Sequence, residues 1–434
     1  MNMHRSLFRS SGFRSSRLGV AVALLIAGSV AIAAPSAENL QKAAAIHQQI
    51  VTFDNHLDIP FEFGSGALDA ATDGESQFDL VKVQKGLIKG GAIAIFVPQG
   101  LRNAEGVKQA RDKAEQKYQI LTSIAKKYPD RAEIAYTPAD VRRIEKAGKF
   151  AIVLSILNGA LIGDDLSQID AWQAKGVRLF GFTHNGNNDL ADSSRPHILL
   201  GDKLDEHGGL SELGKKAVAR LNDKGVVVDV SQLSANALAQ VLSITRAPVV
   251  ASHSNARAII DHPRNLSDAQ LLAIKKNGGV VAVNAYSSWV RPLPPEAQRA
   301  ANEVRAKYGV PQEPNVAGVQ PLTEKGVKVL SREVFAKYSK EFHDVTGDPK
   351  NRATLEEYVN QVDYVVKKIG IDHVGISSDF NHGGGVTGWN DESESLNVTA
   401  ELLRRGYTQE QIAKLWGGNF LRVWEKVQAL AARS

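Results

Sequence analysis

Val226-Val-Val-Asp-Val-Ser231 is a short, apolar, β-branched run that closes on polar residues. A run of this length and composition is typical of a strand that is buried on both faces. The flanking stretches 211–224 and 235–244 instead have the apolar spacing of amphipathic helices. A buried strand between two helices is the repeating unit of a parallel α/β sheet.

The same unit recurs along the chain, so that eight strands are predicted. The strands are expected at 51–55, 91–97, 150–156, 177–183, 226–231, 248–252, 279–284 and 373–378. Helices are expected between them at 104–127, 166–175, 211–224, 235–244, 267–277 and 355–368. Eight buried parallel strands in one α/β chain favour a (β/α)8 TIM barrel over an open doubly wound sheet. No Gly-x-Gly-x-x-Gly follows the first strand, which argues against a dinucleotide-binding fold.

One proline-rich stretch, about 286–352, interrupts the rhythm between the seventh and eighth strands. We interpret it as an insertion with its own short helices. No linker divides the remainder, so residues 34–434 are expected to form one barrel domain.

The first 33 residues have the order of a secretory signal peptide. Basic residues come first, an apolar run at 18–32 follows, and small residues close it. The basic residues are Arg5, Arg9, Arg14 and Arg17. The apolar run is short for a membrane span, although an uncleaved anchor is the alternative. We expect an exported, periplasmic or secreted protein with no membrane span after signal cleavage.

The net charge of +5 therefore misleads about partners. Without the leader the chain has 48 Lys plus Arg against 47 acids, so nucleic acid is not indicated as a partner. The chain has no cysteine, which excludes disulfides, thiol nucleophiles and cysteine-bound zinc.

Polar residues follow the predicted strands at the end where a barrel builds its active site. They are His56 and Asp58, His184, Gln232, His253 and Asp379. Imidazoles and carboxylates that converge on one cavity suit a catalytic zinc ion, which activates water and polarises a carbonyl. The alternative is that each group is hydrogen-bonded locally and serves only structure. The remaining histidines His47, His207, His262 and His343 are expected at the surface or at helix caps.

Several segments, in order, resemble the membrane (renal-type) dipeptidases, a branch of the amidohydrolase superfamily. The matching segments are the His56-x-Asp58 opening, Gly181-Phe-Thr-His184-Asn-Gly-Asn187, Val228-Asp-Val-Ser231, Arg246-Ala-Pro-Val-Val-Ala-Ser-His253, Arg264-Asn-Leu-Ser-Asp268 and His373-Val-Gly-Ile-Ser-Ser-Asp379. The resemblance implies a barrel with a two-zinc centre that hydrolyses dipeptides, some with a C-terminal D-residue.

The resemblance also implies a role for each matching residue. His56 and Asp58 would bind the first zinc ion, and Asp379 would bind it and carry the catalytic proton. His253 would bind the second ion. His184 would contact the scissile carbonyl of the substrate.

Two further matching residues would bind substrate. Arg264 would bind its carboxylate, and Asn187 would line the same pocket. Family members are often homodimers, so a homodimer is a further expectation.

Two positions depart from the family pattern. Leu157 stands where the family has the glutamate that bridges the two ions, and Gln232 stands where the second ion has its other histidine. Leucine has no donor atom, and a neutral amide is a weak zinc ligand. We therefore expect one zinc ion rather than two, with Gln232 as a weak ligand.

Three interpretations follow from these departures. The first is a mononuclear zinc hydrolase that acts on a dipeptide or a peptide-like amide. The second is a binding or maturation factor for a periplasmic peptide such as a siderophore precursor. It rests on a resemblance to dipeptidase-like proteins of pyoverdine maturation. The third is a polar rim with a structural role only.

Overall fold

The computed structural model describes residues 35–65, 68–311 and 328–431. The predicted signal peptide lies outside the described residues. Parallel strands pair in the order β1-β2-β4-β5-β6-β7-β8-β9. The strands are β1 (Phe53–Leu57), β2 (Gly90–Phe96), β3 (Ala132–Ile134), β4 (Phe150–Leu157), β5 (Val177–Gly181), β6 (Val227–Asp229), β7 (Val250–Ala251), β8 (Val280–Asn284) and β9 (Val374–Ser377).

The last strand, β9, lies next to the first strand, β1, and hydrogen bonds join their carboxyl ends. The backbone N–H of Asp379 donates to the carbonyl oxygen of His56 at 3.0 Å, and that of Asp58 donates to Phe380 at 2.9 Å. The strands therefore form a nearly closed parallel barrel, which confirms the predicted (β/α)8 fold.

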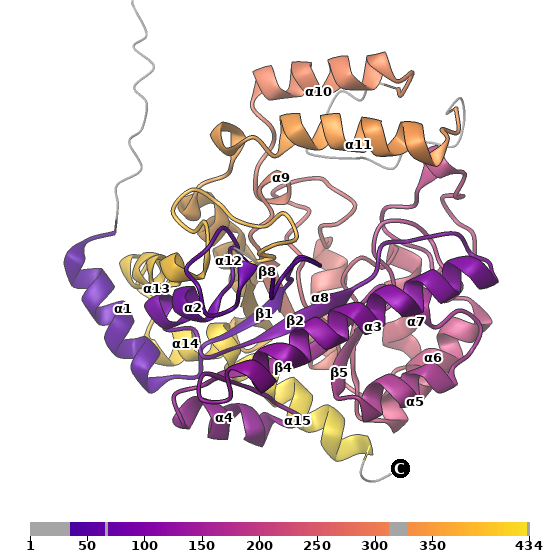
Figure 1. Ribbon diagram of the computed structural model, residues 1–434. Helices are drawn as coiled ribbons and strands as arrows, with labels where there is room; N and C mark the ends of the chain where they lie inside the picture. Colours follow the sequence, from indigo (N-terminus) through magenta and orange to yellow (C-terminus); the bar gives the residue numbers. More distant parts are fainter. Residues whose placement is uncertain (1–34, 66–67, 312–327, 432–434) are drawn as a thin grey trace, which may run out of the picture. The chain divides into compact units, whose positions relative to one another are not determined.

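Helices surround the barrel and follow the strands along the chain (Figure 1). They are α1 (Ala37–Gln49), α2 (Leu80–Gly86), α3 (Ala104–Lys127), α4 (Pro138–Lys146), α5 (Ser167–Ala174), α6 (Glu212–Asp223), α7 (Ala235–Ile244), α8 (Asp268–Asn277), α9 (Ser287–Val290), α10 (Pro295–Lys307), α11 (Arg332–Thr346), α12 (Leu355–Ile369), α13 (Ser395–Arg404), α14 (Gln409–Ala413) and α15 (Asn419–Ala431). Side-chain caps begin many of them; Ser267 and Gln270, for example, form a capping box on α8.

Alternate strand residues point into the barrel and make an inner apolar layer, which includes Phe53, Val153 and Val280. The last helix closes this layer, since Phe420 stacks on Phe53 with ring centroids 4.9 Å apart and Trp424 joins the same cluster. The carboxyl ends of the strands are left as the polar end of the barrel.

Three features differ from the sequence-based expectations. An additional strand, β3, pairs with β4; its three residues are too short to give a periodic signal. Strands β6 and β7 end earlier than predicted, because the N–H groups of Ser231 and Ser252 donate to the Asp229 carboxylate instead of a neighbouring strand. His47 and His262 are fully buried rather than at the surface.

The stretch 286–352 contains α9, α10 and α11 among its described residues. Figure 1 shows α10 and α11 side by side. They share an apolar cluster with Ile198 and Leu199, which follow β5. No helix in the described part of the chain is long and apolar enough to cross a bilayer.

His47 connects α1 to α2, α13 and the segment that contains Trp416. Its Nε2 lies 2.7 Å from Oγ1 of Thr399, its Nδ1 lies 3.2 Å from the carbonyl oxygen of Gly86, and Trp416 meets the ring edge-on. Burial lowers the pKa of His47 from 6.5 to about 4. The imidazole is therefore neutral in the folded protein at pH 7 and is charged in the unfolded chain below pH 6.5.

Acidification should therefore destabilise the fold through His47. Between pH 6.5 and pH 4 the imidazole of His47 is protonated in the unfolded chain but not in the folded protein. The free energy of unfolding therefore decreases as the pH is lowered through that window. From pH 7 to pH 5 this one group should cost about 2 kcal/mol. Urea denaturation at both pH values measures the loss. His47→Gln should show a smaller loss on acidification, whereas exposed His343→Gln should behave as the wild type. Equal losses in all three proteins would contradict this assignment.

Candidate active site

The predicted rim residues meet at the carboxyl ends of the strands. The rings of His56 and His253 stack with centroids 3.9 Å apart and an interplanar angle of 12°. Nε2 of His56 lies 3.7 Å from Oδ1 of Asp379. Both nitrogens of His56 and Oδ1 of Asp379 are buried without a hydrogen-bond partner. These unpartnered atoms mark the centre of the candidate site, since buried polar groups are nearly always bonded.

Asp379 is held firmly in this centre. Its Oδ2 accepts a hydrogen bond from the Asn284 amide at 3.1 Å. Its backbone φ is +57°, a left-handed value that residues other than glycine rarely adopt and that is often found at functional sites. Burial raises the pKa of Asp379 to about 6. The carboxylate is thus a base that titrates close to neutral pH.

His253 is oriented by a chain of hydrogen bonds. Oγ of Ser252 donates to Oδ2 of Asp229 at 2.5 Å and lies 2.7 Å from Nδ1 of His253. With the serine proton on Asp229, Nδ1 of His253 is the donor and its Nε2 is the acceptor. That Nε2 lies 3.2 Å from the amide nitrogen of Gln232. Gln232 therefore uses its N–H, and not its oxygen, toward His253.

Asp58 lies in a buried ion pair. The ammonium of Lys117, on α3, contacts Oδ1 of Asp58 at 2.6 Å and also donates to the Ile59 carbonyl oxygen. The second oxygen, Oδ2, lies 3.0 Å from Nδ1 of His382. Burial by itself raises the pKa of Asp58, but Lys117 and His382 outweigh it and hold that pKa below its ordinary value. Both carboxylate oxygens are thus engaged by donors from the protein.

His382 extends this pair to His184. The two Nε2 atoms lie 3.0 Å apart, and the ring of Phe96 packs against both imidazoles. Asp58, His382 and His184 therefore form a continuous hydrogen-bonded chain. Burial lowers the pKa of His184 well below 6.5, so its ring is neutral at pH 7.

Arg264 is buried against the indole ring of Trp289. It is 2% exposed, donates to the His253 carbonyl oxygen at 2.7 Å, and lies over Trp289 at 4.5 Å. Arg195 lies over the same ring at 5.0 Å and donates to the Gln232 side-chain oxygen at 3.3 Å. Burial lowers the pKa of Arg264 to about 9 and that of Arg195 to about 10. Two guanidinium groups therefore share one wall of the site.

Asn187 uses its side chain within its own loop. Its amide nitrogen donates to the Lys203 carbonyl oxygen at 2.8 Å, and its oxygen accepts the Ser193 N–H at 2.9 Å. Both halves of the amide are thus used to shape the loop after β5.

Leu157 ends β4 in the inner layer and is almost fully buried. A Cβ built on Gly181 would lie 3.6 Å from Cδ1 of Leu157 and 3.7 Å from Oδ2 of Asp229. The Leu157 side chain and the Asp229 carboxylate therefore both border Gly181 at the end of β5.

Sequence reasoning missed three residues of the site: Lys117, His382 and Arg195. A lysine on the buried face of α3, in register with Ala110, Ala114, Leu121 and Ile124, is the signal that could have identified Lys117. His382 lies three residues after Asp379, at the end of the last strand. Arg195 follows the loop segment that contains His184 and Asn187. No pattern in the surrounding sequence indicated that it belongs to the site.

The donors available to a metal ion are few. In residues 35–65, 68–311 and 328–431, no three histidine, aspartate or glutamate side chains are arranged as ligands of one ion. His56 and Asp379 offer free donor atoms, whereas Asp58 is engaged by Lys117 and His382.

Known proteins resemble the chain in sequence and in structure. Residues 40–434 match the family model of membrane dipeptidase, peptidase family M19. Dipeptidase tcpJ of Claviceps purpurea (strain 20.1) is 30% identical over 361 residues, which cover 80% of this chain and 69% of that protein. Dipeptidase verJ of Clonostachys rogersoniana is 27% identical, and the match covers 91% of this chain and 89% of that protein.

A solved structure agrees with these relatives. The probable dipeptidase PvdM from Pseudomonas aeruginosa is 45% identical, with a TM-score of 0.85, and the match covers 91% of this chain and 99% of that one. The family model spans nearly all described residues, including every residue of the candidate site. The chain therefore belongs to the membrane dipeptidase family, peptidase family M19, and is a hydrolase of the metallodipeptidase type.

Proposed function

We propose that this protein hydrolyses the amide bond of a dipeptide, or of a peptide-like molecule with a free carboxylate, at the carboxyl end of the barrel. The observation that carries the proposal is the buried pair of unpartnered groups, His56 Nε2 and Asp379 Oδ1, 3.7 Å apart. An imidazole and a carboxylate without partners are costly to bury, and a hydrolytic site makes use of both. Membership of a dipeptidase family favours hydrolysis over the binding alternative.

The side chains divide the chemistry between them. Asp379, with its raised pKa, accepts the proton of the attacking water and returns it to the leaving amine. His184, which the Asp58–His382 chain holds in place, contacts the scissile carbonyl oxygen. Arg264 and Arg195 provide the positive wall for the substrate carboxylate. A bound zinc ion would lower the pKa of the water and polarise the carbonyl.

The free donor atoms of the site support one zinc ion rather than two. His56 and Asp379 supply buried, free donor atoms for a single ion. Asp58 can join them only by exchanging the ammonium of Lys117 for the metal. The second position lacks donors, because Leu157 has none and Gln232 presents its N–H to His253. The proposal is therefore a mononuclear site in which Lys117 competes with the ion for Asp58.

The proposal also includes export of the protein and its assembly as a homodimer. The leader at residues 1–33 directs export to the periplasm or beyond. The active form is a homodimer, as is frequent in the family.

Hydrolysis should depend on Asp379. A panel of L,L and L,D dipeptides, assayed with zinc present, should show turnover by the wild type. Asp379→Asn should lower kcat by about 10²- to 10⁴-fold, because an amide cannot accept the proton. The exposed Asp130→Asn is the matched control and should leave kcat unchanged. No turnover of any dipeptide by the wild type would overturn the proposal in favour of a binding role.

Removal of Lys117 should change metal binding. Without zinc, Lys117→Met should lose about 3–5 kcal/mol of stability, since it leaves the Asp58 carboxylate buried without its cation. With zinc, the variant should regain stability and bind the ion more tightly than the wild type, because the freed carboxylate becomes a ligand. Thermal unfolding and metal analysis measure both effects without reference to activity.

The matched control is Lys113→Met, one turn earlier on α3 and exposed, which should change neither quantity. The wild type should contain at most one zinc ion per chain. Two ions per chain would contradict the roles given to Leu157 and Gln232, and unchanged zinc affinity in Lys117→Met would contradict the competition.

A further inference from the structure

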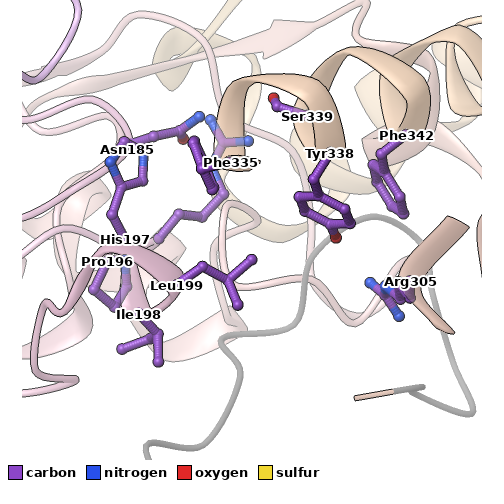
Figure 2. A pocket seen from close by; sticks show the side chains of 11 residues that line it. Asn185, Pro196, His197, Ile198, Leu199, Arg305, Phe335, Tyr338, Ser339 and Phe342 are labelled. Atoms are coloured by element: carbon purple, nitrogen blue, oxygen red, sulfur yellow. The ribbon is translucent and has the colours of Figure 1, made fainter. Parts of the chain in front are cut away.

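A partly open cavity of about 120 Å³, shown in Figure 2, is lined in part by residues next to the active site. Its walls come from the loop after β5 and from helices α10 and α11. The lining residues are Asn185, Arg195, Pro196, His197, Ile198, Leu199, Arg305, Phe335, Tyr338, Ser339 and Phe342.

Most of this lining is apolar or aromatic. Figure 2 shows Phe335, Tyr338 and Phe342 projecting from α11 on the side of the cavity opposite Leu199. The rings of Tyr338 and Phe342 lie 5.7 Å apart, and those of Phe335 and Tyr338 lie 6.3 Å apart. An apolar cavity of roughly 150 Å³ is enough to bind benzene. The present cavity, at about 120 Å³, is of the same order and suits one branched aliphatic side chain or one aromatic ring.

Two residues that line the cavity, Asn185 and Arg195, adjoin residues of the active site. Asn185 directly follows His184, and Arg195 donates to Gln232, which bonds to His253. Oδ1 of Asn185 and Nε of Arg195 are buried without hydrogen-bond partners. An acceptor and a cationic donor without partners are what an amide N–H and a carboxylate of a ligand would satisfy.

Arg195 is better placed than Arg264 to meet such a carboxylate. Arg264 is 2% exposed and binds the His253 carbonyl oxygen, whereas Arg195 is only partly buried and lines the cavity itself. Both lie over Trp289, so a carboxylate on Arg195 also gains from the second positive charge.

We propose that this cavity binds the side chain of the C-terminal residue of the substrate, and that Arg195 binds the carboxylate of that residue. The inference rests on the proposed hydrolysis and narrows its substrate class. The preferred substrates are dipeptides whose C-terminal residue is aromatic or branched aliphatic. Small C-terminal residues leave the cavity largely empty, and cationic ones place a positive charge beside Arg195 and Arg305.

The test compares Ala-Phe and Ala-Leu with Ala-Gly and Ala-Lys as substrates. The wild type should have a kcat/KM at least tenfold higher for the first two, the amount expected from burial of one apolar side chain. Ser339→Trp narrows the cavity from an exposed position, so it should fold normally and remove the preference for Ala-Phe and Ala-Leu. Ser243→Trp, on the exposed face of α7, is the matched control and should keep the preference.

Arg195 is tested separately. Arg195→Met should raise KM for Ala-Phe at least tenfold and should have little effect on Ala-Phe amide, which lacks the carboxylate. An equal rise for both ligands would overturn the role of Arg195.

Ligand-induced shifts in Tm separate this inference from hydrolysis. If no dipeptide is hydrolysed but Ala-Phe raises the Tm more than Ala-Gly, and Ser339→Trp removes the difference, the cavity assignment stands and the hydrolytic proposal falls. If turnover occurs without preference between Ala-Phe and Ala-Gly, hydrolysis stands and the cavity assignment is overturned. With neither turnover nor a difference in Tm, both are overturned.

Discussion

The hydrogen bonds that join β1 to the end of β9 are the contacts on which the active site depends. The N–H of Asp379 donates to His56, and the N–H of Asp58 donates to Phe380. These bonds bring together segments more than 300 residues apart, and they fix His56 and Asp379 on one rim. A parallel barrel has one end at which strand carboxyl termini converge, so groups placed there share a cavity.

Closure of this rim buries several ionisable groups, and their partners decide how each one behaves. Asp58 has the ammonium of Lys117 at 2.6 Å and keeps a pKa below its ordinary value, whereas Asp379 has only an amide partner and its pKa rises to about 6. At the same end of the barrel, Asp58 is therefore a permanently charged carboxylate, whereas Asp379 can gain and lose a proton near neutral pH. The same difference explains why Asp58 is less available to a metal ion than its position in the family pattern suggests.

Much of the fold follows from local patterns. Helices α3 and α7 have the bounds predicted from apolar spacing, because side chains three and four apart along the chain fall on one helix face. Strand ends were less predictable: Asp229 takes the N–H groups of Ser231 and Ser252, and no local pattern indicates that. His47 and His262 were predicted at the surface or at helix caps but are buried, since a single polar residue does not reveal its depth.

The sequence by itself determined the alternation of strands and helices, the rim position of His56, His253 and Asp379, and the absence of donors at Leu157. Tertiary structure alone decided that Lys117, 59 residues from Asp58, neutralises it and that His382 connects it to His184. It also decided that α11 forms one wall of a cavity that Arg195 lines. Local periodicity depends on neighbours along the chain, whereas the state of a buried charge depends on the atoms within a few ångströms of it. Those atoms come from distant segments and meet only when the barrel has closed.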